Sequence, residues 1–557
     1  MGTGKLNLNL LYRANESMDL KLIAIVLFTS LSLPCLAAYS LMKMSLEEKV
    51  GQLLMVHFNG EQANDNAKTL VQDTKVGGII YYNWSNGLNS PEQVQSLSKG
   101  LQKLTEANQN PIPLLIATDQ EGGVVTRLSN GFTVFPGNKA LGETGHPQLA
   151  EDAALAMGEE LLAVGINMNL APVVDVNSNP RNPVIGVRSF GEDPETVLVF
   201  GKKALDGYKQ AGIIAALKHF PGYGEAAVDP HEDLPVVPKS LAELKQAELL
   251  PFAHLASSAD AIMTAHILVP AFDAENCSTL SEKTLSYLRD AIGFKGIIVA
   301  DSLVMEGVVK KCRTVDEAAI QALNAGCDLL ILGGKLLIGE NSRQELTVAD
   351  VQRIHNAIIQ AVKAGRISET RVDQAVERIL DLKNRYLASR NEIQNDLTKI
   401  INTPAHRSLA QDIASRALKT IKNDPCPITS FREKNICVFA PRILQTSLEQ
   451  TDLFKIGKSA APFFFNDVNP AHEEIEAARQ QAKTAEVLFI CSCNAWKNPS
   501  QADLIQSLLA LGKPIVLVVT RDPLDASLFP QATLIYQTFS PAAVSIQAAL
   551  NKLNKKN

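Results

Sequence analysis

The sequence lacks the features that mark several classes of protein. It has no glycine-rich or proline-rich low-complexity tract and no short tandem repeat, so nothing in it points to a fibrous, disordered or repeat protein. Its net charge of −6 gives no reason to expect nucleic acid as a partner. What remains is an ordinary globular composition, with 46% hydrophobic and 20% charged residues over 557 positions. This length predicts a large core and two domains.

Cysteine is also too sparse and too scattered for a disulfide framework. The eight cysteines lie at positions 35, 277, 312, 327, 426, 437, 491 and 493. Cys491 and Cys493 form the one close pair, but their spacing does not match a zinc knuckle. We therefore expect buried free thiols in apolar strands and no metal site.

The N-terminus departs from the globular pattern. Residues 22–38 are apolar or small, with Pro34 as an interruption, and Lys21 precedes them. This arrangement predicts a signal peptide within residues 1–38, and hence a periplasmic or secreted protein. Met18 would then be the start, with residues 1–17 wrongly assigned to the protein. The alternative is an uncleaved N-terminal membrane anchor, although the run is short for a membrane span.

Eight short apolar runs between residues 50 and 335 predict buried strands. They are Leu53–Phe58, Val76–Asn83, Pro113–Gln120, Ile166–Val176, Gly212–Phe220, Ala261–Ile267, Gly296–Ser302 and Cys327–Gly333. Longer amphipathic segments separate them, for instance Pro147–Val164, Pro194–Gln210, Leu241–Ala256 and Thr314–Ala325. Apolar strands that alternate with helices indicate a parallel sheet with both faces covered. Eight units favour a (β/α)8 TIM-like barrel over residues 43–388, with a doubly wound open sheet as the alternative.

A second, smaller α/β domain is expected behind the barrel. A charged helical linker, 389–407, leads into residues 408–557. That domain is predicted to have a helix at Ser408–Lys422 and strands at Ile436–Ala440, Val487–Cys491, Ile515–Val519 and Thr533–Tyr536. Asn494, Arg521 and Asp522 lie near its strand ends, where a role in turns explains them. The predicted fold is thus a barrel followed by an α/β sandwich.

Polar side chains collect where the predicted barrel strands end. The fifth run ends in Lys218 and His219, and the loop behind it holds Asp229 and His231 together with Glu225, Glu232 and Asp233. Asp175 and Asn177 end the fourth run. Such groups are costly to bury unless they face a ligand. The carboxyl ends of barrel strands meet on one face, so we expect the active site there.

Four further motifs add candidates to that face. Asp119 begins the segment Asp-Gln-Glu-Gly-Gly-Val-Val-Thr-Arg127, in which Gly122-Gly123 permits a tight turn that lets Asp119 and Arg127 both reach into the pocket, with a charged loop as the alternative. Arg188 closes a long, weakly polar loop, in which a surface ion pair is the alternative to ligand binding. His266 ends the sixth run as a ligand-facing or a core histidine, and Asp301 follows the uniformly apolar seventh run. An unpartnered carboxylate there would be costly, which favours function for Asp301.

Together these motifs resemble glycoside hydrolase family 3. The ordered set is Asp-Gln-Glu-Gly-Gly at 119, Asn-Pro-Val-Ile-Gly-x-Arg-Ser-Phe-Gly at 182, Lys-His-Phe-Pro-Gly-x-Gly at 218, Met-Thr-Ala-His-Ile at 263 and Asp-x-Leu-x-Met at 301. With an Asp-x-His pair at 229 it is similar to the β-N-acetylhexosaminidase branch that recycles peptidoglycan. The resemblance covers about residues 45–390, and the second domain is similar to one found in many members.

The resemblance implies a role for each matching residue. Asp301 would be the nucleophile of a retaining mechanism, and His231, oriented by Asp229, the general acid/base. The sugar hydroxyls and N-acetyl group would be bound by five residues: Asp119, Arg127, Arg188, Lys218 and His219. The implied substrate is a carbohydrate with N-acetylglucosamine, such as a peptidoglycan fragment. No metal or organic cofactor is implied, and a membrane partner only if the N-terminal segment is uncleaved.

The sequence also departs from the family pattern, and alternatives stay open. Tyr223 stands where the family has histidine, Pro230 separates Asp229 from His231, and Val124 replaces an arginine. Proline restricts the backbone of its own residue and of the one before it, so the loop is expected to be stiffer. The alternatives are a sugar-binding pseudoenzyme, a family 3 β-glucosidase or xylosidase, a different carboxylate of the same loop as acid, and phosphate instead of water as acceptor.

Overall fold

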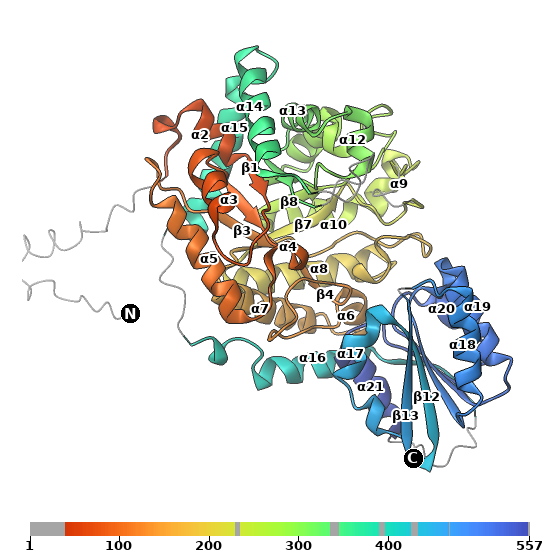
Figure 1. Ribbon diagram of the computed structural model, residues 1–557. Helices are drawn as coiled ribbons and strands as arrows, with labels where there is room; N and C mark the ends of the chain where they lie inside the picture. The colour runs from red at the N-terminus through yellow and green to blue at the C-terminus, as the bar shows by residue number, and fades with distance from the viewer. Residues whose placement is uncertain are drawn as a thin grey trace, which may run out of the picture.

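The computed structural model describes residues 39–228, 234–334, 345–388, 396–424, 433–466 and 468–554. Figure 1 shows a large barrel, coloured red to green, and a smaller second domain in blue beside its lower edge. The predicted signal segment lies outside the described residues, and so do Asp229, Pro230 and His231. Within the described ranges, no helix is both long and apolar enough to cross a membrane.

The first sheet closes into a barrel of parallel strands, which confirms the predicted fold class. Around the barrel the order is β1, β10, β9, β8, β7, β6, β3 and β2. Their bounds are Leu54–Val56 (β1), Gly78–Ile80 (β2), Leu115–Thr118 (β3), Met168–Asn169 (β6), Ile214–Phe220 (β7), Ala261–Thr264 (β8), Ile297–Ala300 (β9) and Leu329–Leu332 (β10). All of these strand residues are buried, because barrel side chains cover one face and helices the other. That double burial explains why the strands are mostly apolar.

Helices alternate with these strands on the outside of the barrel. They are α2 (Leu46–Gln52), α3 (Asp65–Lys68), α4 (Asn83–Asn86), α5 (Pro91–Thr105), α6 (Asn138–Thr144), α7 (Gln148–Ala163), α8 (Pro194–Ala211), α9 (Leu241–Gln246), α10 (Leu249–Leu255), α11 (Glu282–Ser286), α12 (Glu306–Cys312), α13 (Val315–Ala325), α14 (Val348–Lys363) and α15 (Glu369–Leu387). The ends of α8 follow the sequence closely. Asp193 caps it by accepting from the Thr196 N–H, Pro194 opens it, and Gly212 ends it with φ of 78°.

The single helix expected at Leu241–Ala256 is wrong, because two helices are present. Helix α9 ends at Gln246 and α10 begins at Leu249. Ala247 between them has φ of −129° and ψ of −84°, which is not helical. Pro251 explains the break, since its ring would clash with the carbonyl of residue 247 in a continuous helix.

The second domain is built on a six-stranded sheet in the order β11, β16, β15, β14, β12, β13. The strands are β11 (Lys419–Asn423), β12 (Asn435–Pro441), β13 (Ser459–Phe465), β14 (Val487–Ser492), β15 (Ile515–Val519) and β16 (Leu534–Gln537). The helices are α16 (Pro404–Ala417), α17 (Gln445–Glu449), α18 (His472–Ala482), α19 (Pro499–Leu509), α20 (Leu524–Leu528) and α21 (Ala543–Asn554). All neighbouring pairs are parallel except β11 and β16.

Neither edge strand of this sheet, β11 or β13, is predicted by the sequence analysis. The helix predicted to run to Lys422 ends at Ala417, and Lys419–Asn423 is an antiparallel edge strand instead. Its residues are mostly exposed, so no apolar run marks it, and its strand conformation depends on pairing with β16. Strand β13, at the other edge, is also half exposed, but its sequence is mostly apolar. Pro462 within it argues against a strand in the sequence, because proline cannot donate to a β-ladder and is tolerated only at a sheet edge.

Helix α16 joins the two domains. It runs below the barrel toward the blue domain in Figure 1, and Ala417 at its end packs with Ala140 of α6 and Phe539 of the second domain. Lys419 forms an ion pair with Glu143 of α6 at 2.6 Å. The second domain is therefore fixed against the barrel on the side of α6. The domain boundaries themselves stay predictions.

The cysteines of the described residues are free and buried, as expected, although Cys277, Cys312, Cys327 and Cys493 lie outside the strands. Cys277, Cys312, Cys327, Cys437, Cys491 and Cys493 are all buried and free. Burial raises the pKa of the Cys277 thiol to about 12, which keeps it protonated and unreactive at neutral pH. Cys35 and Cys426 lie outside the described residues.

Candidate active site at the carboxyl end of the barrel

A cavity of about 530 Å³ opens at the carboxyl ends of the barrel strands. Its walls come from loops after β2, β3, β6, β7, β8, β9 and β10, which places it where barrel enzymes hold their substrates. The residues that line it are Tyr82, Trp84, Asp119, Glu121, Val125, Arg127, Val184, Ile185, Arg188, Lys218, His219, Tyr223, Met263, Ala265, His266, Asp301, Ser302, Val304, Met305, Gly333 and Gly334.

The Gly-Gly turn after β3 carries two of the predicted substrate residues into the cavity. Strand β4 (Gln120–Gly122) pairs with β5 (Val125–Thr126) in a short antiparallel hairpin. Gly122 and Gly123 have φ of 81° and 60°, and a Cβ on Gly123 would lie 2.6 Å from the Pro136 carbonyl oxygen. The hairpin returns Arg127 to within 3.7 Å of Asp119, and both residues line the cavity, as the sequence predicts.

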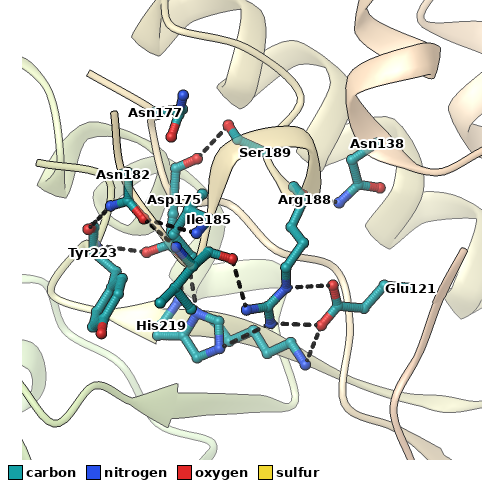
Figure 2. A network of polar contacts seen from close by, with 12 residues as sticks. Glu121, Asn138, Asp175, Asn177, Asn182, Ile185, Arg188, Ser189, His219 and Tyr223 are labelled. Carbon is teal, nitrogen blue, oxygen red and sulfur yellow. Dashed lines mark hydrogen bonds and ion pairs between the residues drawn. The ribbon is translucent and has the colours of Figure 1, made fainter. Parts of the chain in front are cut away.

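Glu121 lies at the centre of a buried ion network that the sequence analysis did not include. Arg188 donates to both of its carboxylate oxygens, from Nε at 2.9 Å and from Nη2 at 2.8 Å. Lys218 Nζ lies 2.7 Å from Glu121 and 2.8 Å from Asp119. Figure 2 shows the fork of Arg188 on Glu121. The network fixes two cationic side chains at one wall of the cavity.

The pKa values of Glu121, Arg188 and Lys218 keep these three side chains charged. Burial raises the pKa of Glu121, but Arg188 and Lys218 outweigh burial and hold it far below its usual value. Burial lowers the pKa of Lys218, but Asp119 and Glu121 outweigh it and the net pKa is raised. At neutral pH the cavity therefore presents fixed cations beside carboxylates, which suits an oxygen-rich polar ligand.

Asp175 orients His219. Its carboxylate is fully buried and lies 2.7 Å from His219 Nδ1, while it also accepts from the His219 backbone N–H at 3.2 Å. Its other oxygen accepts from the Tyr223 N–H at 2.7 Å. The carboxylate thus holds the whole turn from His219 to Tyr223, as Figure 2 shows. With Nδ1 engaged, His219 Nε2 is directed to Arg188 at 3.5 Å.

Asp301 follows β9 directly and lines the cavity. Its Oδ1 accepts from the Ser302 N–H at 2.7 Å. Burial raises the pKa of Asp301, but the charges of His266 and His219 and the Ser302 N–H outweigh burial, and the net pKa is lowered. The carboxylate is therefore ionised at neutral pH and available as a nucleophile.

His266 combines the two roles that the sequence left open. It is buried, with Nδ1 2.8 Å from Thr279 Oγ1 and Nε2 2.9 Å from the Ser302 carbonyl oxygen. It also lines the cavity and lowers the pKa of Asp301. It is a core histidine that supports the Asp301 carboxylate.

An aromatic platform forms another part of the lining. Tyr82 and Trp84 stack at 4.3 Å between ring centroids, and the guanidinium of Arg127 lies 5.4 Å from the Trp84 ring. Trp84 is 44% exposed, so its ring borders the mouth of the cavity. The sequence analysis did not propose Tyr82 and Trp84 for the site, although two aromatic residues at the end of the second apolar run indicate a sugar-stacking surface.

The structure brings most of the predicted site together. Asp119, Arg127, Arg188, Lys218, His219 and Asp301 all line one cavity. Asp229 and His231 lie outside the described residues, so their role stays a prediction, as does that of Glu232 and Asp233. Glu225, named as an alternative acid, accepts from Ser178 Oγ at 2.8 Å and pairs with Lys239 at 3.1 Å.

Two buried carboxylates of the site were present in the analysed motifs but given no role. Glu121 stands two residues after Asp119, the spacing that puts side chains on the same side of a strand. Asp175 ends the fourth apolar run, and it was noted there only as a polar strand end. Nothing in the sequence shows whether Glu121 and Asp175 position other side chains or bind a ligand.

A closed parallel barrel with this cavity at its carboxyl end is the architecture of a TIM-barrel enzyme. The model of the glycosyl hydrolase family 3 N-terminal domain matches residues 45–382, which is more than half of the chain. The chain therefore belongs to glycosyl hydrolase family 3, as its motifs predicted.

Similar proteins have been named as hexosaminidases. The chain is 35% identical over 376 residues to beta-hexosaminidase A of Pseudoalteromonas piscicida, covering 64% of this chain and 61% of that protein. It is 33% identical over 305 residues to the beta-hexosaminidase of Pseudomonas aeruginosa strain LESB58, covering 54% of this chain and 86% of that protein. The match thus spans about three fifths of the Pseudoalteromonas protein.

A solved structure extends the similarity to both domains. The family 3 beta-N-acetylglucosaminidase from Paenibacillus sp. FPU-7 superposes with a TM-score of 0.81 at 34% identity, covering 92% of this chain and 97% of that one. A beta-glucoside phosphorylase superposes with a TM-score of 0.71 at 20% identity, which shows the shared fold alone.

Proposed function

We propose that this protein is a retaining, exo-acting β-N-acetylglucosaminidase. The observation that carries the proposal is Asp301, a half-buried carboxylate at a barrel strand end that its neighbours keep ionised. In the first step Asp301 attacks the anomeric carbon and the bond to the aglycone oxygen breaks. In the second step water displaces Asp301, so two inversions give net retention.

The proton transfers are assigned to His231, with Asp229 as its partner. His231 protonates the departing aglycone oxygen and later accepts the proton of the attacking water. The assignment rests on the Asp-x-His motif that this chain shares with the family. A general acid must be protonated, so kcat/KM falls as pH rises through its pKa. Replacement of His231 by alanine removes that alkaline limb, and an alkaline limb that survives the change contradicts the assignment.

The cationic side chains fixed at one wall of the cavity favour a sugar as the ligand, because a sugar carries many oxygen atoms. Arg188 and Lys218 are fixed by Glu121, and Asp119 and His219 lie beside them in the same cavity. We assign these residues, with Arg127, to the hydroxyls and the N-acetyl group of the sugar. The name of the Paenibacillus protein supports N-acetylglucosamine as that sugar, and the name of the Pseudoalteromonas protein supports a hexosamine. Peptidoglycan fragments are the proposed natural substrates, and the periplasm or the exterior is the proposed location.

The experiment compares two chromogenic substrates that differ at one position. The kcat/KM for 4-nitrophenyl β-N-acetylglucosaminide is expected to exceed that for the β-glucoside by about a hundredfold or more, because a site that hydrogen-bonds an amide rejects a sugar without it. Equal rates would favour a glucosidase. Sugar binding without turnover of either substrate would favour a pseudoenzyme. Release of a sugar 1-phosphate that depends on phosphate would instead identify phosphate as the acceptor.

A further inference from the structure

The segment 182–188 forms one wall of the cavity and carries Arg188. Val184, Ile185 and Arg188 all line the cavity. On the barrel side Asn182 holds the segment, because its Nδ2 donates to the Tyr223 carbonyl oxygen at 2.9 Å while its Oδ1 accepts from the backbone N–H groups of Val184 and Ile185. Figure 2 shows Asn182, Ile185 and Arg188 as parts of the same polar network.

The outer side of this segment is covered by the second domain. Lys497 Nζ, from the loop after β14, donates to the Pro183 carbonyl oxygen at 3.0 Å. Gly186 has φ of 44°, and a Cβ on it would lie 2.4 Å from Asp522 Oδ1. The segment is thus in direct contact with a buried carboxylate of the second domain, at a place where only glycine fits.

The contacting loops of the second domain are themselves tied together. Trp496 Nε1 donates to Asp522 Oδ2 at 3.2 Å, and the Asp522 N–H donates to Asn494 Oδ1 at 3.0 Å. The Trp496 N–H donates to Asp525 Oδ1 at 2.9 Å. Asn494 and Asp522, which the sequence suggested as turn residues, thus build a fixed surface that faces the segment 182–188.

We propose that the second domain determines substrate affinity and specificity through Lys497 and Asp522. These two positioning residues hold the segment 182–188 from outside, and so keep Arg188 and the apolar wall of Val184 and Ile185 in place. The second domain supplies no reacting group in this role. The inference rests on the proposed function only for the identity of the sugar, since the contacts hold whatever ligand the cavity takes.

The test uses one variant on each side of the contact. Lys497→Met removes the donor to Pro183 while it keeps the aliphatic stem, and a threefold rise in KM is expected, about the effect of one exposed hydrogen bond. Gly186→Ala places a methyl group against Asp522, and an increase of about tenfold is expected, because a small displacement of a positioning residue is costly. In both variants kcat stays within about twofold of wild type, because the lost interaction stabilises the bound substrate and the transition state equally.

Two control variants separate positioning from general damage. Lys497→Arg restores a donor and should return KM to the wild-type value. Lys513→Met removes a similar lysine, which donates to the Lys483 carbonyl within the second domain at 2.7 Å, and should leave KM unchanged. The preference for N-acetylglucosaminide over glucoside should fall in Lys497→Met and Gly186→Ala alone.

The outcomes are distinguishable from failure of the proposed function. A wild-type KM in both Lys497→Met and Gly186→Ala overturns the inference, even if the wild type is an active hexosaminidase. A fall in kcat with unchanged KM overturns it as well. If the wild type hydrolyses nothing, calorimetric titration with N-acetylglucosamine replaces the assay. The same fold-changes in Kd then support the inference, and equal Kd values overturn it.

Discussion

The two ends of the barrel carry buried charges of the same kinds but arrange them differently. At the carboxyl end, Glu121, Lys218 and Arg188 form a network whose members line a cavity of about 530 Å³. At the amino end, the fully buried Asp328 precedes β10 and is surrounded by arginines. Arg371 and Arg378 pair with it at 3.1 and 3.0 Å, and Arg289 pairs with its other oxygen.

The difference shows how strand direction separates function from stability. Asp328 also accepts from the Ile298 N–H at 2.9 Å, so both of its oxygens are engaged by the protein. Asp301 accepts from the Ser302 N–H at 2.7 Å and faces the cavity. A fully buried carboxylate therefore serves as a structural clamp at one end, and a half-buried one is the candidate nucleophile at the other, as expected for a TIM barrel.

The largest expected effect is that of Asp301→Asn on activity. The amide cannot form the glycosyl-enzyme, so kcat should fall by about 10⁴-fold, the scale for loss of a central catalytic group. The thermal midpoint should stay within a few degrees of the wild-type value, because the shape of the side chain is preserved. Steady-state rates measure the loss of kcat, and thermal unfolding measures the unchanged thermal midpoint. Activity above a tenth of the wild-type value would remove Asp301 from the mechanism.

Asp328→Asn should produce the reverse pattern. Loss of this charge leaves three arginines without their shared anion, and the free energy of unfolding should fall by about 3 kcal/mol or more. Because Asp328 lies at the amino end, kcat/KM per folded molecule should equal that of the wild type. Denaturant unfolding and active-site-normalised rates measure the two effects. If instead the change costs activity and no stability, the functional contrast between the two ends is wrong.

Glu121→Gln should weaken substrate binding without removal of a reacting group. Arg188 and Lys218 lose the charge that fixes them, so kcat/KM should fall by about a hundredfold, mainly through KM. Steady-state kinetics with the N-acetylglucosaminide check this. A change below threefold would mean that the two cations keep their positions without Glu121.

The smallest expected effect concerns Lys383 at the amino end. Burial lowers the pKa of Lys383 to about 7, and its Nζ donates to Gln52 Oε1 at 2.7 Å and the Gly77 carbonyl oxygen at 2.8 Å. Between pH 7 and about 10.4 the unfolded chain binds a proton there that the folded chain does not. The wild-type stability should therefore rise with pH in this window, by up to about 1.4 kcal/mol per unit.

The matched variant for this effect is Lys383→Met. It lacks the titrating group, so the difference in unfolding free energy between wild type and variant should grow in favour of the wild type from pH 7 to pH 9. Equilibrium unfolding at several pH values measures the difference. A difference that does not vary with pH would show that Lys383 is protonated in the folded protein throughout.

The barrel could be predicted because its strands are buried on both faces. Double burial makes β9 and β10 uniformly apolar, and such runs are visible without a structure. The edge strand Lys419–Asn423 is mostly exposed, so its conformation depends on its partner β16 and not on its own pattern. The break between α9 and α10 could be predicted from the sequence, because Pro251 is incompatible with one continuous helix.

The sequence could predict which residues belong to the candidate site, but not how they are arranged. Strand ends located Asp119, Lys218 and Asp301, because parallel strands of a barrel bring their carboxyl ends together. The partners of these residues depend on distances that a sequence does not contain. Glu121 and Asp175 could be seen as polar, yet that each holds a cation or a histidine follows only from the fold.

The most direct measurement is the trapping of a covalent glycosyl-enzyme. The wild type would be incubated with 5-fluoro-β-N-acetylglucosaminyl fluoride, digested and analysed by mass spectrometry, with Asp301→Asn as the control. We predict an added glycosyl group on the peptide that contains Asp301 in the wild type and none in the variant. An adduct on another residue, or hydrolysis of the N-acetylglucosaminide with inversion of configuration, would contradict the assignment of Asp301 as nucleophile.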